Sequence, residues 1–418
     1  MRWFLILLVS LASPLAAEVW DVPNRSGAIN ETLGRAADGD TLRLSPGTYF
    51  ETLVLDRAVT LDGGGLAIID GGGQGSVITI TGTGITVTGL TVIGSGSSHE
   101  DIDSGIMLTK TSRDVRVTDN RLIGNLYGVD VHGSQDALVA RNVIEGRTDK
   151  QMNARGNGVY VWNAPGAVIA ENDIRWGRDG IFVNSSKRNI FRDNLFRDLR
   201  FAVHYMYAND SEVSGNVSIG NHLGYAVMFS RNVKVIGNVS LNDRDHGMMF
   251  NFTNSGVISG NVVRGSPGKC TFLYNSHKNE FTGNWFEGCG IGIHFTAGSK
   301  NNRIVGNAFV ANRTQVKYVS TQWDEWSENG RGNYWSDFAA YDVDGNGVAD
   351  TAYRPNDSMD RVLWTQPAAK LLLGSPAVQL VRWSQSAFPA LLPGGVIDSF
   401  PMMNPVMPDA MKKVPDDG

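Results

Sequence analysis

SGNVSIGN (214–221) is followed by IGNVSLND (236–243), SGNVVRGS (259–266), TGNWFEGC (282–289) and VGNAFVAN (305–312). The asparagine of this motif recurs nine times, at Asn120, Asn142, Asn172, Asn194, Asn216, Asn238, Asn261, Asn284 and Asn307. The intervals are 22, 30, 22, 22, 22, 23, 23 and 23 residues, and the long one holds an extra stretch at 147–154. A short repeat of Gly, Asn and alternating apolar residues is typical of a solenoid. We predict an all-β, right-handed parallel β-helix with about three short strands per coil.

The repeated asparagine has a structural explanation. Asn tolerates the left-handed backbone conformation and hydrogen-bonds neighbouring backbone groups, so it suits a sharp turn in every coil. Stacked coils would align these side chains into a ladder of amides. We therefore predict turn-forming residues and not ligands.

The chain of 418 residues has a formal charge of −5, which argues against nucleic acid as a partner. Residues 1–17 are typical of a secretory signal: Arg2 precedes an apolar stretch at 3–15, and Ala16 and Ala17 precede an expected cleavage before Glu18. A membrane anchor is the alternative, but the stretch is short for a span. We predict an exported protein.

The remaining chain divides by composition. The predicted parts are an N-terminal cap at 18–40 with a helix at 26–40, the β-helix at 41–320, a closing Trp-rich segment at 321–360, an apolar segment at 361–405 that docks on a membrane partner, and a disordered tail at 406–418. An open solenoid end exposes apolar core and strand edges, which is why a cap is expected.

The two cysteines, Cys270 and Cys289, lie less than one coil apart. Export to an oxidising compartment permits a disulfide. Their offset along the coil makes the geometry unfavourable, so the sequence leaves both alternatives open.

One strand per coil follows the asparagine, and alternation places its residues inside or outside. In the coil of residues 226–230, Val227 and Phe229 are expected to face inward. One outward row is then Asp130, Tyr160, Phe182, His204, Met228, Met249, Phe272 and His294. The next outward row is His132, Trp162, Asn184, Met206, Ser230, Asn251, Tyr274 and Thr296.

This outward surface is rich in aromatic, Met and His side chains, which indicates a binding face. Thioether and imidazole groups suit copper, Cu⁺ especially. The predicted ligands of transiently bound copper are His204, Met206, Met228, Met249 and His294. Docking of a partner without any metal is the alternative, and the predicted docking residues are Tyr160, Trp162, Phe182, Phe272 and Tyr274.

Many β-helices process polysaccharides, and such chemistry needs paired carboxylates in a groove. Asp130 is the one carboxylate in the two predicted rows, so we expect no catalytic residues. A carbohydrate-binding or carbohydrate-processing β-helix is the alternative function.

The stretch YDVDGNGVAD (341–350) spaces oxygen ligands at alternate positions, as Ca²⁺ prefers. The candidate calcium ligands are Asp342, Asp344, Asn346 and Asp350. A turn rich in Asp and Gly that binds nothing is the alternative.

The opening GAINETLGRAADGDTLRLSPGTYFETLVLD (27–56), the GN coils and the closing NYWSDFAAYDVDGNGVADTAYRP (333–355) resemble the NosD family, the periplasmic β-helical maturation proteins of nitrous oxide reductase. The resemblance covers most of residues 18–405. It implies a subunit docked on an ABC-type membrane permease with a cytoplasmic ATPase, and a role in building the copper–sulfide cluster of the reductase. It implies no catalytic residues. The reductase and a copper chaperone are the further expected partners.

Overall fold

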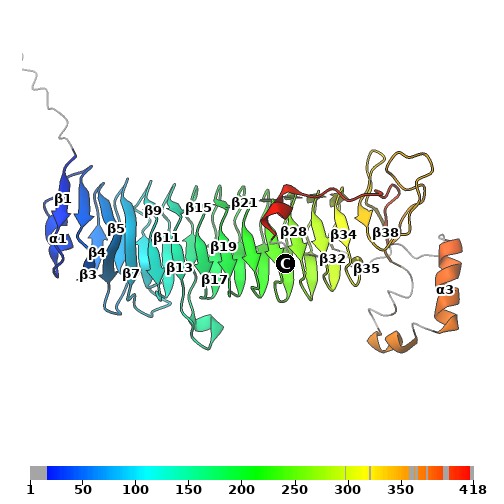
Figure 1. Cartoon of the computed structure of the whole chain (residues 1–418), viewed down its shortest axis with the longest axis horizontal. Coiled ribbons are helices and arrows are strands. Elements are labelled where there is room, and N and C mark those ends of the chain that lie inside the picture. Colours follow the sequence, from blue (N-terminus) through cyan, green and yellow to red (C-terminus); the bar gives the residue numbers. More distant parts are fainter. Residues whose placement is uncertain are drawn as a thin grey trace, which may run out of the picture.

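The computed structural model describes residues 17–296, 298–319, 322–356, 362, 366–372, 375–388 and 395–414. The predicted signal segment therefore lies outside the described residues, except for Ala17. The described chain winds into a long parallel β-helix whose coils follow the sequence from one end to the other (Figure 1). The predicted all-β solenoid is confirmed.

Each regular coil contributes three strands, which stack on their counterparts in register and in parallel. The first ladder comprises β1 (Val19–Val22), β2 (Thr41–Leu44), β5 (Thr60–Asp70), β7 (Thr86–Ile93), β9 (Arg116–Thr118), β12 (Leu138–Ala140), β15 (Val168–Ala170), β18 (Ile190–Arg192), β21 (Glu212–Ser214), β24 (Lys234–Ile236), β27 (Val257–Ser259), β30 (Glu280–Thr282) and β33 (Arg303–Val305).

The second ladder shares β5 and β7 with the first, because these long strands continue around the corner of the coil. Its other members are β3 (Gly47–Phe50), β10 (Arg121–Ile123), β13 (Val143–Glu145), β16 (Asp173–Arg175), β19 (Leu195–Arg197), β22 (Val217–Ile219), β25 (Val239–Leu241), β28 (Val262–Arg264), β31 (Trp285–Glu287), β34 (Ala308–Val310) and β37 (Tyr334–Trp335).

The third ladder is a separate 12-stranded sheet, and we call it the front sheet. It comprises β4 (Leu53–Leu55), β6 (Ile78–Ile80), β8 (Ser104–Leu108), β11 (Tyr127–His132), β14 (Val159–Trp162), β17 (Asp179–Asn184), β20 (Phe201–Met206), β23 (Leu223–Met228), β26 (His246–Asn251), β29 (Lys269–Tyr274), β32 (Ile291–Thr296) and β35 (Val316–Val319). The extra stretch after β13 contains a short 3₁₀ helix, η1 (Met152–Ala154).

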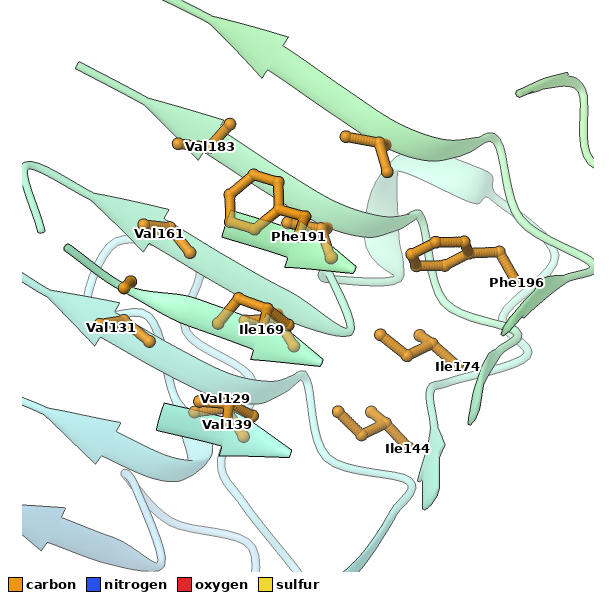
Figure 2. Close-up of a cluster of buried hydrophobic side chains, with 14 of the residues drawn as sticks. Val129, Val131, Val139, Ile144, Val161, Ile169, Ile174, Val183, Phe191 and Phe196 are labelled. Carbon is orange, nitrogen blue, oxygen red and sulfur yellow. The ribbon is translucent and has the colours of Figure 1, made fainter. Parts of the chain in front are cut away.

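The core is a column of apolar side chains that each ladder supplies once or twice per coil. Val161 of β14, Ile169 of β15 and Ile174 of β16 meet inside one coil (Figure 2). All three are fully buried, as are Phe191 and Phe196 one coil further. Because every coil repeats this set, the apolar interior continues along the axis and stabilises the stack.

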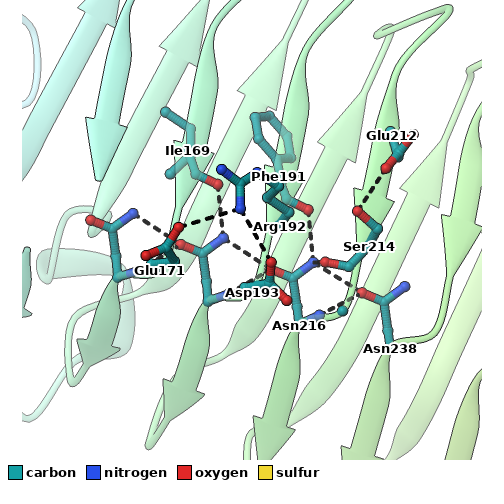
Figure 3. Close-up of polar contacts among 12 residues, drawn as sticks. Ile169, Glu171, Phe191, Arg192, Asp193, Glu212, Ser214, Asn216 and Asn238 are labelled. Atoms are coloured by element: carbon teal, nitrogen blue, oxygen red, sulfur yellow. Dashed lines mark hydrogen bonds and ion pairs between the residues drawn. The ribbon is translucent and has the colours of Figure 1, made fainter. Parts of the chain in front are cut away.

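The nine asparagines form the predicted ladder inside the turn between the first two strand ladders. Asn216 Nδ2 donates to the carbonyl oxygen of Phe191 (2.8 Å) and to Oδ1 of Asn238 (2.9 Å) (Figure 3). Asn216 Oδ1 accepts from the backbone N–H of Asn194 (3.0 Å). The left-handed conformation belongs to the preceding residue, for example Gly215 (φ 64°), so that part of the prediction was wrong. The asparagine therefore stabilises the turn through its side-chain hydrogen bonds and does not itself adopt a left-handed backbone conformation.

The N-terminal cap is smaller than predicted. Helix α1 (Ala28–Leu33) replaces the expected helix at 26–40, and its N-cap residue is Gly27 in the left-handed conformation (φ 75°). The carboxylate of Glu51 caps the first turn by accepting from the backbone N–H groups of Ile29 (3.3 Å) and Asn30 (3.1 Å). Ala28, Ile29 and Leu33 are buried against the first coils, so the helix does cover the apolar end. Strand β1 pairs with β2 and already belongs to the solenoid.

The C-terminal end of the solenoid is closed by two segments that are distant in sequence. Strand β36 (Trp323–Glu325) pairs in parallel with β38 (Gly395–Ile397). The asparagine ladder continues from Asn307 to Asn333, whose backbone N–H donates to Asp398 Oδ2 (2.7 Å). Trp335 Nε1 also donates to Asp398 Oδ2 (2.8 Å). The chain beyond residue 394 is therefore part of the cap.

The apolar appendage leaves and re-enters this cap at one place. Tyr353 and Asp398 form an antiparallel bridge, and Asn356 Nδ2 donates to the carbonyl oxygen of Val316 (2.6 Å). Between these two points lie the short helix η2 (Pro367–Leu372) and helix α3 (Pro376–Ala387), which is drawn beyond the end of the solenoid (Figure 1). Helix α3 begins after Ser375, whose hydroxyl accepts from the Val378 N–H (3.4 Å).

The C-terminal tail differs from its prediction as a disordered segment. Its described part runs back along the coils and ends in η4 (Asp409–Lys413) (Figure 1). Ala410 is buried against Val239, Val262 and Trp285. These strand residues directly follow a ladder asparagine and point outward, so an apolar column on the second ladder gives the tail a place to pack.

Cys270 and Cys289 form a disulfide with a Cα–Cα distance of 5.6 Å. Both side chains are buried inside one coil. The offset that made a bridge unfavourable in the sequence does not matter, because 19 residues carry the chain almost once around the coil. Among the described residues, no helix is both long and apolar enough to cross a membrane.

Candidate functional site

The outward face of the front sheet carries two rows of side chains that strand pairing defines. The first row is Asp130, Tyr160, Phe182, His204, Ala226, Met249, Phe272, His294 and Lys317. The second row is His132, Trp162, Asn184, Met206, Met228, Asn251 and Tyr274.

The predicted register of β23 was wrong by two residues. Met228 pairs with Met206, and Ala226 takes the place predicted for Met228 beside His204. Tyr225 and Val227 are the buried pair, whereas Phe229 lies in the following turn and is 37 % exposed. A two-residue shift preserves inside–outside alternation, so the apolar pattern alone did not detect it.

His204 is held in a fixed orientation by a buried carboxylate. Its Nδ1 lies 3.0 Å from Asp179 Oδ2, and Arg200 donates to both oxygens of Asp179 (2.8 and 2.6 Å). Burial opposes ionisation of Asp179, but the hydrogen bonds from His204 and Arg200 outweigh it and lower the pKa of this carboxyl. An ionised carboxylate only accepts, so Nδ1 carries the proton and Nε2 is left for another ligand.

Stacking fixes the plane of the same ring. Phe182 stacks on His204 with centroids 4.6 Å apart, and Tyr160 stacks on Phe182 at 5.3 Å. Phe201 meets His204 edge-on at 5.0 Å. The predicted docking residues Tyr160 and Phe182 therefore support His204 as well as contributing to the surface.

Three methionines lie around His204 with Ala226 at their centre. His204 precedes Ala226 by one coil and Met249 follows it by one coil. Met228 lies two residues further along the strand of Ala226, and Met206 is its pairing partner. The small side chain of Ala226 leaves the imidazole and the thioethers as the functional groups at this place. The face therefore brings together four of the five predicted copper ligands.

His294 is separated from this group by Phe272 and lies in a cationic corner. Burial, followed by the charges of Lys269 and Lys317, lowers the pKa of His294 to about 3. Lys269 Nζ donates to His246 Nε2 (3.1 Å) and lies 4.0 Å from the ring centroid of Phe272. A cationic surrounding disfavours a metal cation, so the geometry does not support the predicted role of His294.

Asp130 begins the first row and is fully buried. Neither of its oxygens has a hydrogen-bond partner, and the nearest ion-pair contact is His132 Nδ1 at 3.6 Å. Burial raises the pKa of this carboxyl. The predicted docking residue Trp162 stacks on His132 at 4.4 Å.

A column of exposed aromatic rings beside the second row was missed. Tyr207 and Phe229 stack at 5.0 Å, Phe229 and Phe252 stack at 5.3 Å, and the predicted docking residue Tyr274 meets Phe252 edge-on. Tyr207, Phe229 and Phe252 have left-handed backbones (φ 49–50°). Each lies nine residues before a ladder asparagine, so the same spacing could have found them.

The loop at 342–350 does not assemble the predicted calcium site. Asp342 accepts from the backbone N–H groups of Gly345 (2.7 Å) and Gly347 (2.8 Å), and the bond from Gly347 is the largest cause that lowers its pKa. Asp350 accepts from the Val343 N–H (2.7 Å), and Asn346 donates to Asp344. Within the described residues, no group of three or more His, Cys, Asp or Glu side chains is arranged to hold a metal ion. The carboxylates instead stabilise the turn.

Comparison with solved structures agrees with the fold. The A-module of the mannuronan C-5 epimerase AlgE6 of Azotobacter vinelandii superposes with a TM-score of 0.56 at 15% identity, covering 70% of this chain and 90% of that chain. A mannuronic acid specific polysaccharide family 6 lyase from human gut microbiota gives 0.53 at 12% identity, covering 75% and 87%. At such identities the likeness concerns the β-helix alone.

Comparison of sequences is more specific. A family model described as "Periplasmic copper-binding protein (NosD)" matches residues 140–340. A protein of Pseudomonas aeruginosa called "Probable ABC transporter binding protein NosD" is 38% identical over 412 residues, covering 95% of this chain and 94% of that protein. One of Stutzerimonas stutzeri with the same name is 38% identical over 387 residues, covering 89% of each. Identity along nearly the whole length of both chains shows that this protein belongs to the NosD family.

Proposed function

We propose that this chain is a periplasmic accessory factor that handles copper during assembly of the copper–sulfide cluster of nitrous oxide reductase, together with an ABC-type membrane complex. Membership of a family described as periplasmic and copper-binding supports the compartment and the metal. The relatives' name, ABC transporter binding protein, supports the membrane partner. The reductase and a copper chaperone are the partners that such a function requires.

His204 carries this proposal. A metal-binding histidine commonly donates its second N–H to a carboxylate, which fixes its orientation, and Asp179 provides this contact. Met206, Met228 and Met249 add thioethers, which together with imidazole favour Cu⁺. A site with few ligands binds a metal reversibly. That suits a protein that passes copper on and performs no catalysis itself.

The test removes the ligands but keeps the fold. In the variant His204→Ala/Met228→Leu/Met249→Leu, Asp179 keeps both hydrogen bonds from Arg200, so no buried carboxylate loses all its partners. Titration of the apoprotein with Cu⁺ against a chromophoric chelator should show affinity lowered at least about tenfold. The variant should still join its membrane complex and yield a reductase with an incomplete cluster.

A matched control separates copper binding from general damage. His277→Ala/Met403→Leu/Met407→Leu removes the same types of side chain away from the front sheet and should leave the Cu⁺ affinity unchanged. A normal affinity and a complete cluster in the first variant would contradict copper binding at His204. Loss of the membrane complex would instead assign the face to docking.

The carbohydrate alternative fits the face less well. Sugars pack on exposed ring faces, but Tyr207, Phe229 and Phe252 cover one another's faces, with interplanar angles of 16° and 9°. Two carboxylates of this face, Asp130 and Asp179, are fully buried, and Asp179 is paired with Arg200. Neither forms an accessible acid–base pair.

We further propose that the appendage between residues 356 and 395 attaches the protein to the membrane complex. Helix α3 exposes Leu380 and Trp383, each 63 % accessible, at the end of the solenoid. Large apolar side chains grouped on an exposed helix favour a protein partner. Because the appendage starts and ends at one place in the cap, it can be removed without opening the solenoid.

A further inference from the structure

The turn after each front-sheet strand contains a left-handed residue at an equivalent place in six successive coils. These residues are Asn163, Ser185, Tyr207, Phe229, Phe252 and Asn275, with φ between 45° and 56°. Each donates its backbone N–H to the following coil, which shows that the positions correspond. Asn tolerates this conformation, whereas bulky side chains disfavour it. Because the flanking coils form the same turn with Asn or Ser, the turn itself does not require the three aromatic residues.

The three aromatic residues and Tyr274 form a continuous exposed surface, which we call the aromatic column. Tyr207 is 51 % exposed, Phe229 37 %, Phe252 41 % and Tyr274 43 %. Consecutive ring centroids lie 5.0, 5.3 and 5.9 Å apart. Coils stack about 4.8 Å apart, so the four rings span about 14 Å along the solenoid. Exposed aromatic rings grouped in this way are typical of a binding surface.

The same turns carry positive charge. The segments 185–188, 207–210, 229–232, 252–255, 275–278 and 298–301 together form what we call the basic turn, and Asp210 is their one carboxylate. Their cationic side chains, all exposed, are Lys187, Arg188, Arg231, Lys278 and Lys300. Among the residues that the structure describes, no carboxylate forms an ion pair with any of these five side chains. On the second ladder, by contrast, Arg197 is paired with Asp173 (2.6 Å).

Hydrogen bonds between coils hold the basic turn in place. Asn209 Oδ1 accepts from the backbone N–H of Arg231 (2.9 Å), and Asn254 Oδ1 accepts from that of His277 (2.9 Å). His277 Nδ1 accepts from the backbone N–H of Lys300 (3.2 Å). The backbone that carries the charges is therefore preformed, which lowers the ordering cost of binding a partner.

We propose that the aromatic column and the basic turn form one docking surface for an acidic segment of a partner protein that also carries aromatic or aliphatic side chains. The unpaired cations attract the acidic groups, and the exposed rings provide the apolar contact. An anionic polysaccharide fits this surface less well. Sugars pack on ring faces, and Tyr207, Phe229 and Phe252 cover one another's faces, with interplanar angles of 16° and 9°.

This surface adjoins the proposed Cu⁺ ligands but contains none of them. Met206 and Met228 directly precede Tyr207 and Phe229, so a partner bound to the column lies beside these thioethers. The inference does not depend on copper binding, and it concerns the coils and not the appendage. An extended segment rises about 3.3 Å per residue, so about four or five residues cover the column. A contact of this size is typical of a transient complex.

The experiment compares three synthetic probes on the mature, full-length protein by fluorescence anisotropy. The probes are a random copolymer of glutamate and tyrosine, polyglutamate of the same length, and oligomannuronate as an anionic sugar. At low salt the copolymer should bind at least about tenfold more tightly than polyglutamate, because it adds ring contacts to the charge contacts. Added salt should weaken the binding of both polymers, because the charges are exposed.

Two variants separate the rings from the charges. Phe229→Asn/Phe252→Asn supplies the residue that Asn163 and Asn275 already provide at this turn, so the backbone is kept. It should lower affinity for the copolymer at least about fivefold and leave polyglutamate binding unchanged. Arg231→Gln/Lys278→Gln should lower affinity for both polymers at least about fivefold.

Matched controls lie elsewhere on the solenoid. Phe50→Asn removes a 65 % exposed ring on β3, and Lys110→Gln/Arg116→Gln removes two exposed cations from an earlier coil. Both control variants should bind all three probes like the wild type. The Cu⁺ affinity of Phe229→Asn/Phe252→Asn should also equal that of the wild type, so that docking and copper binding can fail separately.

Three results would overturn the proposal. The first is equal affinity of the wild type for the copolymer and polyglutamate, which would show that the rings contribute nothing. The second is tighter binding of oligomannuronate than of the copolymer, which would assign the surface to an anionic sugar. The third is a wild-type dimer that Phe229→Asn/Phe252→Asn converts to a monomer in sedimentation velocity, which would show that a second copy of this chain covers the column.

Discussion

The asparagine ladder and the outward face of the front sheet are built by the same coils, yet they treat polar groups in opposite ways. In the ladder, the amide of Asn216 bonds to the coil before it and the coil after it. On the front sheet, Asp130 and His132 leave buried polar atoms without partners. Along the asparagine ladder the repeat thus satisfies its own polar groups. Departures from it mark where a ligand or partner is to be sought.

The left-handed residues show the same difference. Beside the ladder this conformation falls on glycine in five successive coils, at Gly215, Gly237, Gly260, Gly283 and Gly306. In the four preceding coils it falls on polar residues, at Asp119, Arg141, Glu171 and Asp193. Beside the front sheet it falls on Tyr207, Phe229 and Phe252, although bulky side chains disfavour it. Glycine follows the needs of the backbone, whereas the aromatic residues indicate selection for their rings.

The largest expected effect comes from breaking the ladder at its C-terminal end. Truncation after Pro355 removes Asp398, which accepts from Asn333 and Trp335, and Val396, which is buried. The loss should exceed about 5 kcal/mol of unfolding free energy, because apolar core and ladder groups are exposed together. Replacing residues 357–394 with a short glycine linker keeps these contacts. Chemical denaturation should show a fold close to wild type for this variant.

The same pair of variants tests the appendage. The variant with the glycine linker should no longer co-purify with the membrane complex from detergent extracts. Retained co-purification would move the docking site onto the coils. If the truncated chain proved as stable as the linker variant, Asp398 would not be the end of the ladder that the hydrogen bonds indicate.

The next largest effect is expected within the ladder. Asn216→Val leaves the backbone N–H of Asn194 and the carbonyl oxygen of Phe191 without partners in the interior. Two orphaned buried groups cost about 2–6 kcal/mol together. The matched control is Asn184→Val on the front sheet, whose side chain contacts only Ser185 Oγ in the described hydrogen bonds, and it should change stability by less than about 0.5 kcal/mol. Equal losses in urea denaturation would contradict the comparison.

These two regions also differ in how far the sequence predicts them. The asparagine spacing and the alternation of residues such as Val161 and Ile169 predict the coils and the core, because each coil must bury the same face. The register of Met228 could not be predicted in this way, since a shift of two residues keeps the alternation. The tail was predicted from composition alone. The tail packs on an apolar column that includes Val239 and Trp285. This column forms only when the coils are stacked, so the sequence of the tail does not indicate it.

The site itself was predicted by residue type but not by contact. Methionine and histidine on one face suggested copper, and the structure does gather His204, Met228 and Met249. The carboxylate that orients His204 comes from the preceding coil, 25 residues earlier, and no local motif signals it. The long contact between Asp130 and His132, and the missing hydrogen bonds to their buried atoms, become apparent only in the packed structure.

A third prediction concerns Asp243, a buried carboxyl at the position that the asparagine amide of Asn221 occupies one coil earlier. Asp243 Oδ1 accepts from the backbone N–H of Asn221, as Asn221 Oδ1 accepts from Leu199 one coil earlier. Burial raises the pKa of Asp243 to about 7 from an ordinary value of 3.8, although Ser240 and Ser218 donate to it. The folded state therefore holds the proton more tightly than the unfolded chain. The contribution of Asp243 to stability is fully present below the ordinary pKa of 3.8 and is lost as the pH rises towards about 7.

Between pH 5 and pH 8 the loss from Asp243 should be about 2–3 kcal/mol. Asp243→Asn should remove most of this dependence, leaving the smaller contribution of Asp398, whose pKa burial raises to about 6. Urea denaturation at several pH values measures this pH dependence of the unfolding free energy. Asp114 is exposed, so Asp114→Asn is the control. A stability that rises with pH over this range in the wild type would contradict the assignment.

The smallest effect on stability, and the sharpest contrast with the ladder, is expected at Phe229. Phe229→Asn relieves a left-handed aromatic residue, which gains about 1–2 kcal/mol, and removes two stacked pairs worth about 0.5–1.5 kcal/mol each. These terms nearly cancel, so unfolding free energy should change by less than about 1 kcal/mol. If the column serves a partner, the variant should recover several-fold less membrane complex or reductase in co-purification. Phe50→Asn, at a 65 % exposed phenylalanine on β3, should not. A large loss of stability with unchanged partner recovery would instead make the column structural, like the ladder.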